Sequence, residues 1–146
     1  MLGDIDIMAT VAVKDIEKAR KFYVDKLGLK PRESGNGMLT LATGKTSLFV
    51  YESDFAGTNK ATAATWTVDD DVENYVAQLR NKGVTFEHYN FPGSRLEGDV
   101  HHLGEMKGAW FKDPDGNIFH IVGPETTSTR DTGVKTSREK AKVGTP

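Results

Sequence analysis

The sequence predicts an α+β fold built from two tandem βαβββ modules, whose strands form a curved mixed sheet around a groove. Three observations lead to this prediction. Strand-like and helix-like periodicities alternate along the chain, glycines and prolines separate them, and the same order of elements occurs twice. The expected boundaries are residues 1–58 for the first module, 59–123 for the second, and 124–146 for a polar C-terminal tail.

The first module begins with a predicted strand followed by a helix. Apolar residues occupy the odd positions of residues 5–13, which is the two-residue period of a half-buried strand. Asp15 is a favourable helix N-cap, and Gly28 closes the helix that follows it. Two short apolar segments, 38–42 and 47–51, flank a glycine and predict a hairpin.

The second module shows the same sequence of signals. Acidic residues at 69–71 offer helix caps, apolar side chains recur at helical spacing from Val72, and Gly83 closes this helix. An Asp-Pro-Asp-Gly turn at 113–116 joins the last two strands. The predicted strands of this module are 65–68, 85–89, 108–112 and 117–122.

The two halves also align residue by residue. Val13-Lys14-Asp15 matches Val68-Asp69-Asp70 at an offset of 55, and Gly28-Leu29 matches Gly83-Val84 at the same offset. One residue of slippage is needed inside the helix. The alternative is a chance likeness between two αβ segments, which the shared order and lengths of the elements argue against.

The amino-acid composition excludes several classes of function for this chain. The chain has 146 residues, a net charge of −2 and no cysteine, which argues against nucleic-acid partners and excludes disulfides, thiolate zinc sites and iron–sulfur clusters. No apolar run reaches the length of a membrane span, and the N-terminus lacks the pattern of a signal peptide. We therefore expect a cytoplasmic protein with no membrane partner.

Two segments in this repeat resemble a known family. The segments VAVKDIEKARKFYVDKLGL and FKDPDGNIFHIV are similar to the vicinal oxygen chelate superfamily, which includes glyoxalase I, extradiol dioxygenases, fosfomycin-resistance enzymes and bleomycin-resistance proteins. The resemblance covers residues 5–123 and implies the glyoxalase/bleomycin-resistance fold. It also implies a homodimer, because small-molecule binders of this kind commonly pair.

The resemblance implies four metal-ligand positions facing the groove. At these positions the sequence has Met8, Glu52, Ala63 and His120. A thioether is a poor ligand for hard or borderline divalent ions, alanine offers no donor atom, and a histidine replaces the usual glutamate. We therefore expect no family-type metal centre and no cofactor. The fallback is a divalent metal held by Glu52, His120 and either His101 or His102.

Strand parity predicts which side chains face the groove. The expected lining is small or weakly polar, which leaves room for an apolar or aromatic ligand. Trp110 would supply a stacking wall, although a core or dimer-interface position is the alternative. The predicted ligand-binding residues are Met8, Thr10, Ala63, Thr65, Trp110 and His120.

His120 and Glu52 are the candidate catalytic residues. His120 lies on a predicted strand of the groove and would act as a polar anchor or general base, or form only a local hydrogen bond. Glu52, if buried nearby, would form an acid–base pair with it; otherwise this carboxylate is merely solvated. His101 and His102 are adjacent, so an extended backbone points them to opposite faces; the alternative is an exposed pair.

These observations favour a protein that binds or sequesters a small apolar or aromatic compound without transforming it. The rival hypothesis is an enzyme of the same superfamily, a lyase, isomerase or dioxygenase, with a rebuilt metal site or with His120 as general base. A third class is an interaction module that uses the C-terminal tail.

Overall fold

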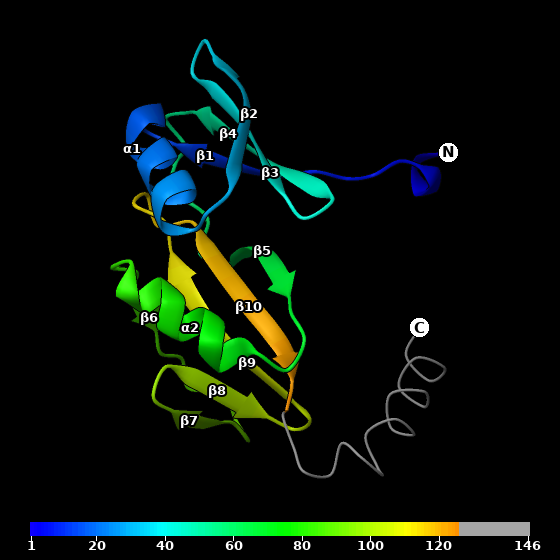
Figure 1. Ribbon diagram of the computed structural model, residues 1–146, viewed down its shortest axis with the longest axis vertical. Coiled ribbons are helices and arrows are strands. Elements are labelled where there is room, and N and C mark those ends of the chain that lie inside the picture. Colours follow the sequence, from blue (N-terminus) through cyan, green and yellow to red (C-terminus); the bar gives the residue numbers. More distant parts are fainter. Residues whose placement is uncertain (126–146) are drawn as a thin grey trace.

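A computed structural model describes residues 1–125 and shows two modules, each a sheet with a helix packed on one face (Figure 1). The described part of the chain therefore follows the predicted α+β architecture. From residue 126 onward, the predicted C-terminal tail (124–146) lies outside the residues that the structure describes. No helix of residues 1–125 is long and apolar enough to cross a membrane.

The first module contains a four-stranded sheet in the order β1-β4-β3-β2. Strands β1 and β4 run parallel, and the other neighbouring pairs are antiparallel. Helix α1 continues directly into a π-helical turn. The elements are β1 Ala9–Val13, α1 Ile16–Arg20, the π-helical turn Lys21–Lys26, β2 Lys30–Gly35, β3 Met38–Thr43 and β4 Thr46–Glu52.

The second module repeats this arrangement and extends it. Its main strand order is β5-β10-β9-β8-β7, with β5 and β10 parallel and the short strand β6 paired with β9. A β7–β8 hairpin enlarges one edge of the sheet. The elements are β5 Thr62–Thr67, α2 Val72–Asn81, β6 Phe86–Glu87, β7 Arg95–Glu97, β8 Val100–Leu103, β9 Met106–Lys112 and β10 Ile118–Pro124.

The π-helical turn explains the slip between the two halves. The Asp15 carboxylate caps α1 by accepting from the backbone N–H groups of Glu17 and Lys18, as the sequence predicted. A π-helical turn accommodates one more residue than an α-helical turn. The first helix therefore absorbs its extra residue before Gly28, which has a φ of +80° like its counterpart Gly83 at +90°.

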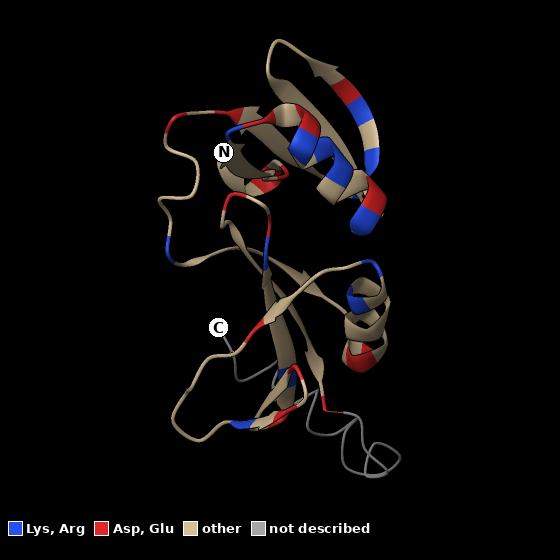
Figure 2. Ribbon diagram, turned by 90° about the vertical axis from the view of Figure 1, so that its left-hand side faces the viewer, with Lys and Arg blue, Asp and Glu red and all other residues tan. Residues whose placement is uncertain are grey.

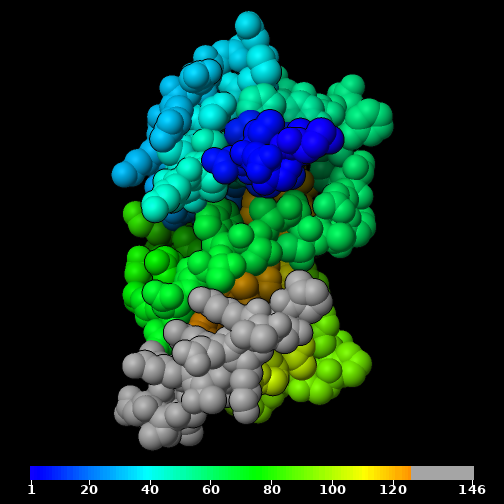
Figure 3. Space-filling view, turned by 90° about the vertical axis from the view of Figure 1, so that its right-hand side faces the viewer, coloured from blue at the N-terminus to red at the C-terminus, as the bar shows by residue number. Residues whose placement is uncertain are grey.

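The predicted strand at 5–13 is shorter in the structure. The ladder with β4 begins at the pair Ala9 and Leu48, so residues 5–8 have no place in the sheet. Ile7 is 91% exposed, and the N-terminal segment projects away from the first module (Figures 1 and 3). The apolar alternation there does not correspond to a buried face.

The structure contains strands that the sequence did not predict. Strand β2 is exposed along its whole length and forms the outer edge of its sheet, and blue and red bands on its ribbon mark its charged residues in Figure 2. Its register shifts near Pro31, which carries no N–H for the ladder. The β7–β8 hairpin lies in a region that reads as a Gly/Pro-rich loop. Both elements lack the apolar alternation that marks a half-buried strand.

The core lies between the helices and the two sheets, and both modules contribute to it. The Tyr23 ring from the first module meets the Phe119 ring edge-on at 5.8 Å, and Phe22 lies 6.3 Å from Phe111. Parity in β1 is as predicted, because Val11 and Val13 are buried on the helix side. The two modules therefore share one hydrophobic core.

The turn between β9 and β10 fastens the second module to the first. Asp113 accepts hydrogen bonds from the backbone N–H groups of Asp115 and Asn117 and from the Tyr23 hydroxyl. The Asn117 amide donates to the carbonyl of Ala12 at 2.8 Å. The Asp-Pro-Asp-Gly turn predicted from the sequence therefore also joins the two modules, with its polar groups satisfied while buried.

Candidate functional site

Trp110 and His120 form a stacked pair on the face of the second sheet that lies opposite α2. They are cross-strand partners on β9 and β10, and their ring centroids are 4.0 Å apart with planes inclined by 9°. The Trp110 indole N–H donates to the Thr62 hydroxyl at 3.2 Å. Phe111, next in the chain, is fully buried on the helix side, so the predicted parity of Trp110 is confirmed.

The absence of a side chain at Gly108 leaves room for the His120 ring. The imidazole lies across β9, and a Cβ added at Gly108 would come within 2.5 Å of His120 Nε2 and 2.8 Å of the Ile121 carbonyl oxygen. Both distances are shorter than real Cβ contacts allow. Any side chain at this position therefore requires the imidazole or the strand to move.

His101 from β8 completes the group of rings. Its ring stands at 90° to that of Trp110, with centroids 5.0 Å apart, and the residue is only 3% exposed. The backbone N–H of Tyr89 donates to His101 Nε2 at 2.9 Å. Among the described residues, His101 Nδ1 is buried and has no hydrogen-bond partner. Burial of a polar atom without a hydrogen-bond partner costs free energy of folding.

These rings line a pocket of about 280 Å³. Its walls are mostly apolar, and the rings of His101 and His120 form part of them. That volume suits one ring system, since pockets for drug-sized ligands begin at about 300 Å³. The lining residues are Phe91, His101, Leu103, Met106, Lys107, Gly108, Trp110, His120 and Val122.

Both imidazoles favour the neutral state. Burial lowers the pKa of His120, and the nearby His101 lowers it further. Burial also lowers the pKa of His101, against the opposing effect of the backbone of Gly108 and Tyr89. A neutral His101 whose Nε2 accepts from Tyr89 carries its proton on Nδ1. This Nδ1 atom is enclosed by the protein and is not exposed to the pocket.

Of the residues predicted to bind a ligand, Trp110 and His120 line this pocket, whereas the small residues do not. Thr65 is the β5 neighbour of His120 but is exposed. A register shift in β5 leaves Ala63 unpaired, and Thr62 takes the contact with Trp110 instead. Met8 precedes β1, and Thr10 pairs with Phe49 in the other sheet. The predicted single groove wall from both modules is not formed by these side chains.

Glu52 lies apart from His120, so the predicted acid–base pair does not form. It ends β4 in phase with Leu48 and Val50, which are buried on the helix side. Its carboxylate accepts from the backbone N–H of Ile16 at 3.1 Å, at the first residue of α1. The sequence leaves the register of this strand open, and a shift of one residue decides which face of the sheet the side chain occupies.

The implied metal-ligand set does not fit the chain as folded. Met8 is outside the sheet, Glu52 faces the helix side, and Ala63 has no donor atom. His102 points away from His101, as predicted for adjacent strand residues, and pairs with Glu125. Within residues 1–125, no group of three or more histidine, aspartate or glutamate side chains is placed to hold a metal ion.

Sequence reasoning missed the aromatic side of the pocket. Tyr89 and Phe91 flank His101, and the Phe91 ring lies 5.2 Å from that of Trp110. Leu103 is the last residue of β8 and Met106 is the first residue of β9. The aromatic residues around His88, in the letters EHYNF, are the only local signal that pointed there.

Comparison with known proteins agrees with this architecture. The family model of the Glyoxalase/Bleomycin resistance protein/Dioxygenase superfamily matches residues 5–121. No curated protein matches the sequence significantly.

Three solved structures illustrate the shared fold. A glyoxalase/bleomycin resistance protein/dioxygenase from Alicyclobacillus acidocaldarius is 21% identical, with a TM-score of 0.63 over 85% of this chain and 95% of that one. A lactoylglutathione lyase from Agrobacterium tumefaciens is 15% identical, with a TM-score of 0.61 over 81% and 92%. A fosfomycin resistance protein, FosX, from Listeria monocytogenes is 17% identical, with a TM-score of 0.63 over 84% and 93%. At these identities the likeness concerns the fold, and the family model decides membership: the chain belongs to the glyoxalase/bleomycin resistance protein/dioxygenase superfamily.

Proposed function

We propose that this protein binds a small aromatic compound in the pocket beside Trp110 and His120, without a metal ion and without transforming it. The observation that carries the proposal is the pocket itself, whose walls combine the stacked rings of Trp110 and His120 with the rings of Phe91 and His101. Aromatic and aliphatic walls of this kind favour an aromatic ligand.

The ring geometry defines the ligand further. Trp110 and His120 already stack on each other, so a ligand would meet the remaining exposed edges and the rings of Phe91 and His101. Aromatic pairs favour edge-to-face or offset contact, which suits a flat aromatic ring. The pocket volume of about 280 Å³ limits the buried portion to about one such ring system.

The rival function is catalysis with His120 as general base. The pKa of His120 is lowered by burial, so its imidazole is neutral near pH 7 and able to take a proton. No acidic side chain lies among the residues that line the pocket. This enzyme would belong to the lyase or isomerase members of the superfamily, with the same pocket as its substrate site.

One experiment separates the two functions. The chain has two tryptophans, and the variant Trp66→Phe leaves Trp110 as the only one. A panel of single-ring and fused-ring compounds, each with a carbonyl or ring-nitrogen acceptor, is titrated against Trp110 fluorescence. We expect saturable quenching by some members, and recovery of the compound unchanged as judged by mass spectrometry. Phe91→Ala should weaken this binding roughly tenfold, because it removes an aromatic ring from the pocket wall.

The outcomes are distinct. A compound recovered in altered form, with turnover lost but binding kept in His120→Ala, identifies an enzyme and overturns the binding-only proposal. A panel that leaves Trp110 fluorescence unchanged overturns the site itself. Elemental analysis of protein purified without chelators tests whether binding is independent of metal. Near-stoichiometric metal in the parent protein that is lost in His120→Ala would contradict this part of the proposal.

We also propose that the protein forms a homodimer. The first sheet exposes apolar side chains on its open face, where Phe49 and Tyr51 stack at 6.1 Å and Met38 pairs with Tyr51 across the strands. Tyr51 and Met38 are 37% and 44% exposed. Burial of such a face is a common reason for association. Equilibrium ultracentrifugation that returns a monomer at high protein concentration contradicts this part.

A further inference from the structure

A carboxylate outside the pocket, that of Asp99, ties three separate elements of the second module together. Asp99 lies in the two-residue turn between β7 and β8, and its side chain is 22% exposed. Its Oδ2 atom accepts from Nε and Nη2 of Arg80 on α2, at 3.1 and 2.7 Å. Its Oδ1 atom accepts from Nε2 of His88, which follows β6, at 2.7 Å. We call these three side chains the Asp99 clamp.

The carboxylate of the clamp is ionised. The hydrogen bond from His88 holds the pKa of Asp99 below its usual range, and the Arg80 guanidinium adds to this effect against the opposing effect of partial burial. Hydrogen bonds to an ionised acceptor are shorter and stronger than those between neutral groups. The clamp therefore fixes His88 relative to both the β7–β8 turn and α2.

The segment that begins at His88 leads directly to the pocket. The backbone N–H of Tyr89 donates to Nε2 of His101 at 2.9 Å. Two residues later, the Phe91 ring lies against the rings of Trp110 and His101, with centroids 5.2 and 5.9 Å away. This short stretch of chain therefore connects the clamp to the wall of the pocket.

The turn that carries Phe91 keeps its shape through its own bonds. The Phe91 carbonyl accepts from the N–H and the hydroxyl of Ser94, at 3.1 and 2.8 Å. Pro92 and Gly93 lie between them, and Gly93 has the φ of +80° that a type II turn requires. Residues 88–94 belong to no strand. The position of this turn beside the pocket therefore depends on the contacts at the start of the segment.

We propose that Asp99 is a positioning residue for the pocket beside Trp110, because the clamp holds the segment that places Phe91 against Trp110. The inference rests on the function proposed above, since it assigns Asp99 a role in that same site. Asp99 is not among the residues that line the pocket, so it acts only through this segment. Loss of the clamp should let Phe91 move away and expose Trp110 to solvent, since segments with few backbone contacts open locally.

Hydrogen exchange at the Tyr89 amide measures how firmly the clamp holds the segment. Asp99→Ala removes the acceptor of the clamp, and we expect the exchange rate of the Tyr89 N–H to rise roughly tenfold, the effect of one lost charge-assisted hydrogen bond on a local opening equilibrium. Asp99→Asn keeps an acceptor oxygen and should give a smaller increase. Glu97→Gln is the matched control on the same hairpin, because it breaks only an exposed pair with Arg95 and should exchange as the parent does.

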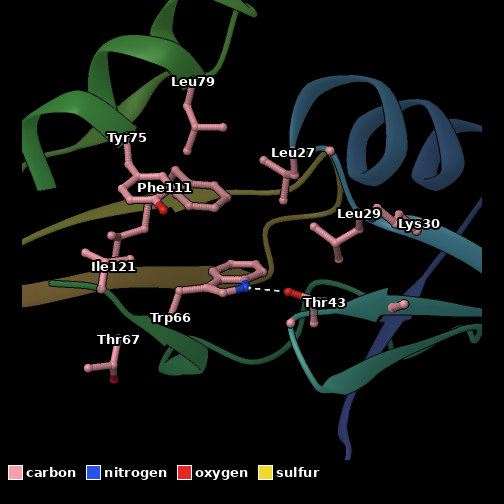
Figure 4. A pocket seen from close by; sticks show the side chains of 14 residues that line it. Leu27, Leu29, Lys30, Thr43, Trp66, Thr67, Tyr75, Leu79, Phe111 and Ile121 are labelled. Atoms are coloured by element: carbon pink, nitrogen blue, oxygen red, sulfur yellow. Dashed lines mark hydrogen bonds between the residues drawn. The ribbon is translucent and has the colours of Figure 1, made fainter. Parts of the chain in front are cut away.

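Acrylamide quenching of Trp110 measures access to the pocket and needs no ligand. The full chain carries Trp66→Phe, because Trp66 lies on the opposite face of the sheet, where its indole N–H donates to Thr43 Oγ1 of the first module at 3.0 Å (Figure 4). Asp99→Ala and Phe91→Ala should each increase the quenching. Because Asp99 acts through Phe91, the double variant should be quenched no more than Phe91→Ala alone.

The proposal is overturned if Asp99→Ala behaves as the parent in both measurements, if Glu97→Gln has the same effect as Asp99→Ala, or if the quenching effects of Asp99→Ala and Phe91→Ala add. Should far-UV circular dichroism show that Asp99→Ala does not fold, Arg80→Gln takes its place. It removes only the helix side of the clamp, and unchanged exchange at Tyr89 then overturns the proposal. Neither measurement uses a ligand, so a pocket that binds no compound overturns the proposed function and leaves the role of Asp99 standing.

Discussion

The Tyr23 hydroxyl donates a 2.5 Å hydrogen bond to Oδ2 of Asp113 and so links the helix of one module to the β9–β10 turn of the other. Both side chains are buried. Burial and the neighbouring carboxylate raise the pKa of Tyr23 well above its ordinary value, so the hydroxyl remains a donor at every physiological pH.

Removal of that hydroxyl should destabilise the protein. Tyr23→Phe keeps the ring but deprives the buried Asp113 carboxylate of one donor, which costs about 1–3 kcal/mol. Urea denaturation measures the change in free energy of unfolding. Tyr51→Phe is the matched control, since Tyr51 is partly exposed and should change stability by less than about 0.5 kcal/mol. Equal effects of the two substitutions would contradict the assigned role of Tyr23.

Gly108→Ala should disrupt the stack of Trp110 and His120. The new methyl group would lie 2.5 Å from His120 Nε2, so the imidazole must move. The ring protons of His120, which lie against the indole, should shift in the NMR spectrum, and ligand quenching of Trp110 should weaken. Gly3→Ala meets no atom within 4 Å and serves as control. Unchanged His120 resonances would show that the strand moves instead.

The free energy of unfolding should fall as the pH is lowered, in part because of His120. Its folded-state pKa lies below its ordinary value of 6.5, so the unfolded chain binds more protons between these two values. Stability from this residue is therefore present above pH 6.5 and decreases below it. Urea denaturation across this range should show a shallower pH dependence in His120→Phe, and an NMR titration of His120 at or above 6.5 would refute the prediction.

Glu73 on α2 should stabilise the packing of this helix on the second sheet. Its carboxylate lies 2.7 Å from Lys107 Nζ, and the Lys107 side chain is 1% exposed. Glu73→Gln removes the negative partner of a buried ammonium group, and we expect a loss of about 1–3 kcal/mol in urea denaturation. Glu17→Gln breaks only an exposed pair with Arg20 and should cost less than about 0.5 kcal/mol. A similar cost for both would contradict the prediction.

Local patterns in the sequence were sufficient to predict most of the fold. The Asp15 cap, the glycines that end both helices and the Asp-Pro-Asp-Gly turn each have a direct physical meaning, and the structure contains all of them. Strand β2 was missed because an exposed edge strand needs no apolar alternation. The strand predicted from Ile5 was wrong, since alternation alone does not supply a pairing partner.

The site was less predictable because it depends on register. His120 and Trp110 follow from parity within regular strands, and the structure brings them together. The groove position predicted for Ala63 differs from the structure because a register shift in β5 leaves this residue unpaired. The face that Glu52 occupies was not predictable, because the sequence does not fix the register of β4. Phe91 reaches the pocket from the loop between β6 and β7, where the sequence has neither helix nor strand periodicity.

The connection between the modules has a consequence for how the molecule opens. Residues 53–61 tether β4 to β5, so the two halves remain covalently neighbours even when the contacts of Asp113 and Trp66 break. A short tether gives each half an effective concentration of about millimolar for the other. Damage to these contacts should therefore increase the rate of local opening, measured by hydrogen exchange at β1 and β10, to the same extent at every protein concentration.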